Sequence, residues 1–165
     1  MKPPNRIVLM GVSGAGKTTV GGLLAEKLSG VFIDGDDLHP QVNVDKMKQG
    51  VALTDNDRRP WLDRVAKVIR EHDGASPLII ACSALKNRYR KRLGDDYHLV
   101  YLQGTPGEIA RRLQARQLQG GDDHFMPVSL LESQFEALEE PNNAVVMDVE
   151  QPPQEIAAKI ILALS

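Results

Sequence analysis

The stretch Gly11-Val12-Ser13-Gly14-Ala15-Gly16-Lys17-Thr18 decides the fold of this chain of 165 residues. It fits the pattern G-x-x-x-x-G-K-[ST], which is typical of loops that bind nucleotide phosphates. Its three glycines let the backbone curl so that successive N–H groups point at phosphate oxygens. An apolar run enters the stretch and a helical pattern leaves it, as the motif requires. We therefore expect residues 11–18 to bind a nucleoside triphosphate.

Two side chains of this loop carry predicted chemistry. Lys17 should reach the β- and γ-phosphates and act in catalysis, and the Thr18 hydroxyl can offer an oxygen to Mg²⁺. The metal also needs an acid, which normally ends an apolar strand. Val31–Asp34 and Val145–Asp148 both end in one. We favour Asp34, because further acids follow it closely, and interpret Asp148 as a turn residue at a strand end.

Short apolar runs alternate with helical patterns along the whole chain, which is typical of an α/β fold with a parallel sheet. The runs expected to form strands are Ile7–Met10, Val31–Asp34, Leu78–Cys82, Leu99–Leu102 and Val145–Val149. Apolar residues at helical spacing begin at Leu62 and at Ile156, and Thr105-Pro106 resembles a helix start. We predict one domain over residues 1–165, a five-stranded parallel sheet flanked by helices on both faces.

Composition excludes several classes of protein. Twenty Lys and Arg against 22 Asp and Glu give a net charge of −2, which disfavours nucleic acid or an anionic membrane as the partner. The single cysteine, Cys82, excludes an internal disulfide and lies in an apolar run where buried packing is expected. The apolar run Ile7–Val12 is too short to span a membrane. We expect a cytoplasmic protein. The strings D-x-x-G and N-K-x-D do not occur, which disfavours a translation-factor-like GTPase.

Further motifs extend from the loop to about Pro141. They include Asp34-Gly-Asp36-Asp-Leu-His39-Pro40, Leu53-Thr-Asp55-Asn-Asp57-Arg58-Arg-Pro60-Trp61, Ala81-Cys-Ser-Ala-Leu-Lys86, His124-Phe125-Met126 and Ser133-Gln134. Together they resemble the gluconokinases of the thermoresistant, shikimate-kinase-like type. The resemblance implies transfer of a phosphoryl group from ATP to the 6-hydroxyl of D-gluconate, with Mg²⁺. It also implies a P-loop kinase fold with a closing lid, a cytoplasmic location and a homodimer.

The acceptor side needs a carboxylate and cations. An acceptor hydroxyl requires a carboxylate that orients it and accepts its proton late in the transfer, and Asp36 is the candidate. A sugar acid also requires a cationic clamp, for which Arg58 and Lys86 are the first choices. His39 is a further candidate for substrate contact. Arg59 and Arg90 are weaker candidates, and a surface ion pair is the alternative fate of each cation.

One basic segment and one tryptophan have structural roles as the alternative to functional ones. The run Lys86–Arg92 holds five basic residues in seven, and we interpret it as a solvated helix face. Trp61 follows Pro60 at the start of a helical pattern, where it could simply anchor the core.

A lid is expected over about residues 112–127. Arg112 and Arg116 lie four apart on a predicted helix and lead into Gly120-Gly121. Arg112 is predicted to contact the nucleotide and Arg116 to act on the transferring phosphoryl group. Compared with the resembled family, the stretch 117–123 is longer and ends in acids, so shortening it should change KM and kcat together. Two alternatives stay open: a kinase of another small hydroxy acid such as shikimate, and a nucleotide-binding regulator without transferase activity.

Overall fold

The structure is a computed structural model that describes residues 5–118 and 128–165. The elements in chain order are β1 (Arg6–Met10), α1 (Lys17–Leu28), β2 (Val31–Asp34), the 3₁₀ turn η1 (Gly35–Leu38), α2 (Gln41–Lys48), α3 (Asp55–Glu71), β3 (Leu78–Ala81), α4 (Asn87–Arg92), β4 (His98–Gln103), α5 (Pro106–Leu118), α6 (Val128–Ala137), β5 (Val145–Asp148) and α7 (Pro153–Leu164). Each predicted strand is present within one residue at either end.

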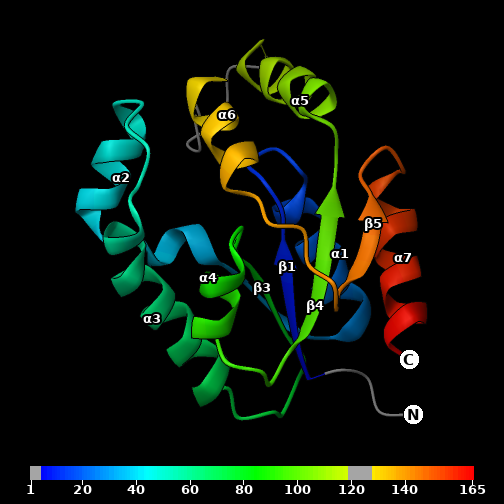
Figure 1. Ribbon diagram of the computed structural model, residues 1–165. Coiled ribbons are helices and arrows are strands. Elements are labelled where there is room, and N and C mark those ends of the chain that lie inside the picture. The colour runs from blue at the N-terminus through cyan, green and yellow to red at the C-terminus, as the bar shows by residue number, and fades with distance from the viewer. Residues whose placement is uncertain (1–4, 119–127) are drawn as a thin grey trace.

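The five strands form one sheet in the order β2-β3-β1-β4-β5, and every neighbouring pair is parallel. The central strand β1 is buried on both faces, which explains its uninterrupted apolar sequence. In a parallel sheet all strands end at the same edge. The loops after β1, β2 and β3 therefore meet there, and α5 and α6 lie beyond that edge (Figure 1).

Helices cover both faces of the sheet, as the alternation predicted. Ile7 and Leu9 of β1 pack into one core cluster together with residues of α1 and α7, whereas Val8 and Met10 pack into a second cluster with α3 and α4. Successive strand residues face opposite sides of a sheet, so one short strand anchors both layers. Figure 1 shows α1 and α7 on one side and α3 and α4 on the other.

Two buried residues behave as the sequence indicated. Cys82 belongs to the second cluster and is fully buried, and this burial raises the pKa of its thiol to about 12. Trp61 is 1% exposed in the same cluster, which confirms its packing role. Trp61 also belongs to the functional site described below.

Two helix starts have clear physical causes, and that of α5 is the one that the sequence predicted. Thr54 and Asp57 form a reciprocal capping box at the first turn of α3. Thr105 accepts a hydrogen bond from the Glu108 amide at 3.3 Å, and α5 begins at Pro106 as predicted. Within the described ranges no helix is both long and apolar enough to cross a membrane. Residues 119–127 of the expected lid, including Gly120-Gly121 and His124-Phe125-Met126, lie outside the described residues.

Candidate active site

The phosphate-binding loop has the strand–loop–helix geometry that its sequence predicted. Gly14 and Gly16 have φ angles of 87° and 98°, a left-handed conformation that favours glycine. α1 begins at Lys17, directly after Gly16. The Lys17 Nζ donates to the carbonyl oxygens of Gly11 at 2.8 Å and Val12 at 3.0 Å. The helix N-terminus and its lysine therefore point at the same loop, which is the arrangement that binds an anion.

Lys17 also lies in the field of the acids that follow β2. Burial lowers the pKa of its ammonium, and the carboxylates of Asp36 and Asp34 oppose that shift. Arg116 of α5 lowers the same pKa by repulsion. The three residues predicted to act in catalysis, Lys17, Asp36 and Arg116, are thus close enough to interact, although they come from three different elements.

The two predicted metal ligands are neighbours. The Thr18 hydroxyl lies 3.4 Å from Oδ2 of Asp34 and donates to it. The other carboxylate oxygen of Asp34 accepts from the Asp36 amide at 3.0 Å and so caps the first turn of η1. A hydroxyl and a carboxylate are oxygen donors of the kind that Mg²⁺ prefers. The donor set therefore fits this ion.

A cavity of about 380 Å³ opens beside the loop, within the size range of small-molecule sites. Lys17, Asp36, His39, Arg58, Trp61 and Gln134 are among the residues that line it. One cavity therefore joins the phosphate-binding lysine to three of the four residues predicted to bind the acceptor. Lys86 is not among the described residues that line it.

The turn that carries Asp36 is held from both sides. Gly35 passes so close to β3 that an added Cβ would lie 2.2 Å from the carbonyl oxygen of Ala81. Trp61 donates its indole N–H to the Gly35 carbonyl at 2.7 Å. Trp61 is consequently more than a core anchor, because it fixes the backbone next to the predicted catalytic carboxylate.

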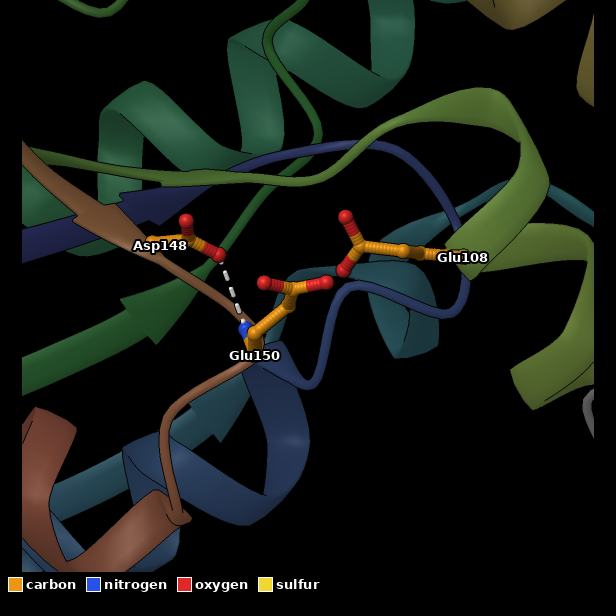
Figure 2. Close-up of side chains that lie close together, drawn as sticks. All are labelled: Glu108, Asp148 and Glu150. Atoms are coloured by element: carbon orange, nitrogen blue, oxygen red, sulfur yellow. Dashed lines mark hydrogen bonds between the residues drawn. The ribbon is translucent and has the colours of Figure 1, made fainter.

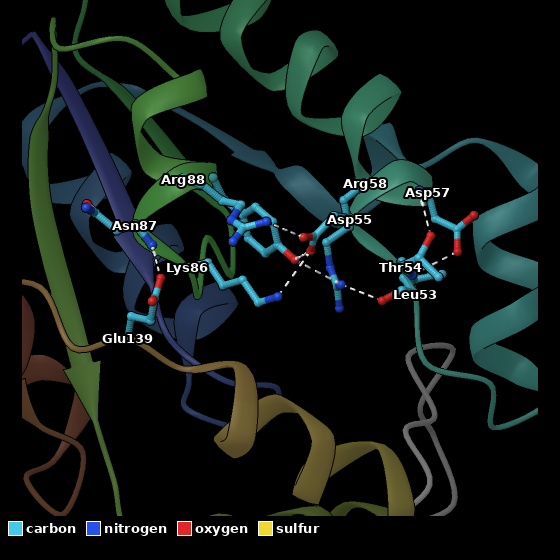
Figure 3. A network of polar contacts seen from close by, with 10 residues as sticks. Leu53, Thr54, Asp55, Asp57, Arg58, Lys86, Asn87, Arg88 and Glu139 are labelled. Atoms are coloured by element: carbon cyan, nitrogen blue, oxygen red, sulfur yellow. Dashed lines mark hydrogen bonds and ion pairs between the residues drawn. The ribbon is translucent and has the colours of Figure 1, made fainter.

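Arg58 and Lys86 both lie near the ring of Tyr89, and Figure 3 shows the network of polar contacts around them. The guanidinium of Arg58 lies 5.4 Å from the ring centroid of Tyr89 and donates to its hydroxyl at 3.2 Å. Lys86 Nζ lies 5.6 Å from the same ring centroid and 3.2 Å from Oδ1 of Asp55. Hydrogen bonds from Tyr89 and Lys86 lower the pKa of Asp55. Lys86 is therefore paired, and its predicted contact with substrate stays a prediction.

His39 is held by a stack and a hydrogen bond. Its ring lies on Trp61 with the centroids 4.1 Å apart and the planes 16° from parallel. The side-chain amide of Asn43 contacts Nδ1 at 3.2 Å. Burial, together with Arg58 and Arg64, lowers the pKa of His39 to about 4. The imidazole is neutral at pH 7 and lines the cavity as an uncharged polar group.

The interpretation of residues 86–92 as a solvated helix face is wrong for Arg90. This residue is 6% exposed and donates to the carbonyl oxygens of Ala84, Leu85 and Glu139 at 2.8–3.1 Å. Its role is therefore to satisfy buried backbone groups. Arg92 on the same helix is exposed and pairs with Asp63 at 2.8 Å, as expected for a surface charge.

Sequence reasoning assigned no role to Asn43 or Gln134. Asn43 is fully buried in α2, and Oε1 of Gln134 accepts from the Ser13 amide of the phosphate-binding loop at 2.7 Å. Gln134 stands in a motif that carries the family resemblance, but its partner Ser13 lies 121 residues away in the chain, and the Asp57 carbonyl that Asn43 contacts lies 14 residues away.

A second cavity of about 250 Å³ adjoins the phosphate-binding loop. Gly14, Gly16, Arg112, Arg116 and Val149 contribute to its lining. Arg112 donates to the carbonyl oxygen of Val149. Both predicted lid arginines therefore face the nucleotide loop from α5.

Asp148, the alternative metal ligand, ends β5, at the opposite edge of the sheet from β2 and Asp34. Its carboxylate accepts from the Glu150 amide at 2.9 Å and closes a turn at the strand end, and oxygens of Glu108, Asp148 and Glu150 lie within 4.8 Å of one another (Figure 2). The turn role favoured by the sequence fits this geometry, whereas Asp34 is the acid beside Thr18.

Comparisons with known proteins agree on one family. Residues 13–165 match the family model described as shikimate kinase. The chain is 48% identical over 144 residues to the thermosensitive gluconokinase of Escherichia coli K12, over 81% of this chain and 71% of that protein. The crystal structure of a gluconokinase from Sinorhizobium meliloti 1021 is 40% identical, with a TM-score of 0.87, over 99% of this chain and 93% of that one.

A shikimate kinase from Bacteroides thetaiotaomicron superposes with a TM-score of 0.67 at 21% identity, a likeness that shows the fold alone. The gluconokinases are similar in both sequence and fold, and they confirm the resemblance that the motifs indicated. The chain belongs to the gluconokinase family, kinases of the shikimate-kinase-like P-loop fold.

Proposed function

We propose that this protein transfers the γ-phosphoryl group of ATP to the 6-hydroxyl of D-gluconate. One observation carries the assignment of roles: a single cavity is lined by Lys17 of the phosphate-binding loop and by Asp36, His39 and Arg58 on the acceptor side. Phosphoryl transfer requires the protein mainly to position the reactants and to neutralise charge. A cavity that reaches both groups is suited to that task.

On the nucleotide side, the amides of residues 11–18 bind the phosphates, and Lys17 contacts the β- and γ-phosphates. The second cavity, beside Gly14 and Arg112, holds the base and ribose. Arg116 neutralises charge on the transferring group. Thr18 and Asp34 would hold Mg²⁺, which would neutralise negative charge on the phosphates of the nucleotide.

On the acceptor side, Asp36 orients the 6-hydroxyl and accepts its proton as the bond to phosphorus forms. Arg58 binds the carboxylate of gluconate, because a planar guanidinium matches a carboxylate with two hydrogen bonds. His39 donates to the polyol. Lys86 is the second cation proposed for the carboxylate, from its position on the same tyrosine ring as Arg58.

A coupled ADP-release assay across a panel of polyols and sugar acids tests the proposal. Strong release with gluconate alone is expected, with 6-phosphogluconate identified by phosphorus NMR. ADP release with another hydroxy acid, and not with gluconate, would identify that acid as the substrate. Tight ATP binding without acceptor-dependent turnover would identify a nucleotide-binding regulator.

A cytoplasmic location and a homodimer are further parts of this proposal, and they rest on the family resemblance. Sedimentation equilibrium is expected to give twice the chain mass. A monomer at all concentrations would contradict the dimer without affecting the proposed reaction.

A further inference from the structure

We propose that Asn43 is a positioning residue that fixes the tautomer of His39, so that Nε2–H of His39 donates a hydrogen bond to the sugar acid. Asn43 lies on α2 and is 1% exposed, and its side chain contacts His39, which lines the cavity. The inference deepens the proposed function and rests on it for the identity of the acceptor.

The orientation of the Asn43 amide follows from a backbone carbonyl. Its Nδ2 donates to the carbonyl oxygen of Asp57 at 2.9 Å and lies 3.2 Å from Nδ1 of His39. If the amide were turned over, Oδ1 would face the Asp57 carbonyl, and two acceptors would meet without a proton between them. The Asp57 carbonyl therefore requires the NH₂ group on this side.

This orientation determines where the imidazole proton lies. Because an NH₂ group has only donors, Nδ1 of His39 must be the acceptor and carry no proton. A neutral imidazole then has its proton on Nε2. His39 is neutral because burial and the nearby Arg58 and Arg64 of α3 lower its pKa to about 4.

The other amide atom of Asn43 argues against a packing role. Oδ1 is buried and has no hydrogen-bond partner among the described residues. An unsatisfied buried carbonyl is unfavourable, and a leucine of similar size would avoid it. The asparagine is therefore useful for its donor side, which contacts Asp57 and His39.

The ring is also fixed in the other directions. Stacking on Trp61 at 4.1 Å sets the plane of the imidazole, and Trp61 is itself bound to the carbonyl of Gly35, next to Asp36. Nε2 is the remaining polar atom of a ring that lines the cavity. A fixed N–H donor beside Asp36 and Arg58 suits a hydroxyl or carboxylate oxygen of the substrate.

A double-mutant cycle tests this role. Asn43→Leu removes the amide, and His39→Gln replaces the ring by an amide whose NH₂ donates without any tautomer. In the wild-type background, Asn43→Leu is expected to raise KM for gluconate about tenfold and to leave KM for ATP unchanged. In the His39→Gln background the same change should alter KM by less than about twofold.

Equal effects of Asn43→Leu in both backgrounds would overturn the proposal, because a structural role through α2 does not depend on residue 39. Asp45→Asn is the matched control on the same helix, since the exposed Asp45 side chain accepts a hydrogen bond from Gln41, also on α2.

Nitrogen-15 NMR of histidine-labelled protein gives a readout that does not depend on turnover. The His39 signals are identified by their loss in His39→Gln. Wild type is expected to show a protonated Nε2 and an unprotonated Nδ1 at pH 7, and a proton on Nδ1 would refute the assignment. If Nε2–H is observed but the enzyme releases no ADP in the presence of gluconate, the proposed function fails and the tautomer assignment stands.

Discussion

The two halves of the site are built in different ways. The nucleotide half is mainly the backbone of one continuous stretch, residues 11–18, with two glycines in left-handed conformations. The acceptor half consists of side chains from η1, α2 and α3, which the fold brings to one cavity. Function in the first half therefore depends on local chain geometry, whereas in the second half it depends on contacts between distant residues.

The acceptor half of the site is supported by side chains that donate hydrogen bonds to backbone carbonyl oxygens. Trp61 donates to Gly35, Asn43 to Asp57, and Arg90 to three carbonyls of two loops. A substitution in this half can therefore remove a group that contacts the substrate, a hydrogen bond that holds such a group in place, or both. The following experiments separate these effects.

The largest effect is expected from the carboxylate at the boundary between the two halves. Asp36→Asn keeps the shape of the side chain but cannot accept the proton of the acceptor hydroxyl, so kcat should fall by about 10³-fold. ATP affinity, measured by calorimetry, should stay within about twofold, because the amides of residues 11–18 bind the phosphates.

Asp37→Asn is the matched control, since it removes the same charge one residue further along η1. A loss below about tenfold is expected there, because the reaction needs a carboxylate at one position. Equal losses in both variants would show that net charge, and not a general base at Asp36, supports catalysis.

The buried Arg90 provides the next test, on stability. Arg90→Met removes the donor to the carbonyl oxygens of Ala84 and Glu139 and one of two donors to that of Leu85, at a cost of about 3 kcal/mol in the free energy of unfolding. Arg92→Met breaks one exposed ion pair and should cost less than about 1 kcal/mol. Urea unfolding of both variants measures the difference. Similar losses of unfolding free energy in the two variants would mean that the hydrogen bonds of Arg90 contribute no more than an exposed ion pair.

A smaller effect is expected from the protonation of His39. Its folded pKa of about 4 lies below its ordinary value of 6.5, so the unfolded chain binds more protons between these pH values. The stability that this group contributes is present above pH 6.5 and is lost as the pH falls toward 4. Between pH 7 and 5, wild type should lose on the order of 2 kcal/mol more than His39→Gln.

Urea unfolding at several pH values tests this difference. The carboxylates titrate in both proteins and cancel in the comparison. Parallel stability curves for wild type and His39→Gln would mean that His39 is not held neutral by its surroundings.

The contrast between the two halves also explains what the sequence could predict. The five strands agree with the prediction within one residue, because β-branched and aliphatic runs between turn residues are a local signal. Thr18 and Asp34 lie side by side, as their motifs at a loop and at a strand end indicated, and their role as metal ligands stays a prediction. The local geometry of the nucleotide half could therefore be predicted from residues that are close together in the chain.

The contacts of the acceptor half could be predicted only in part. Arg90 looked like its solvated neighbours, because its carbonyl partner at Glu139 lies 49 residues away. Asn43 lies four residues after His39, a spacing at which neighbours on a helix can touch, but the Asp57 carbonyl that orients it could not be read from spacing. The pairing of Lys86 with Asp55 was hidden for the same reason.

The smallest effect separates the two cations predicted for the substrate carboxylate. Arg58→Lys keeps the charge in the cavity but loses the planar fork, so KM for gluconate should rise about tenfold. Lys86→Met should raise it by less than about threefold, because Asp55 already neutralises the ammonium and Lys86 is not among the described residues that line the cavity. KM for ATP should be unchanged in both variants. A larger rise for Lys86→Met than for Arg58→Lys would make Lys86 the main carboxylate ligand, and the lining of the cavity would then be a poor guide to the acceptor half.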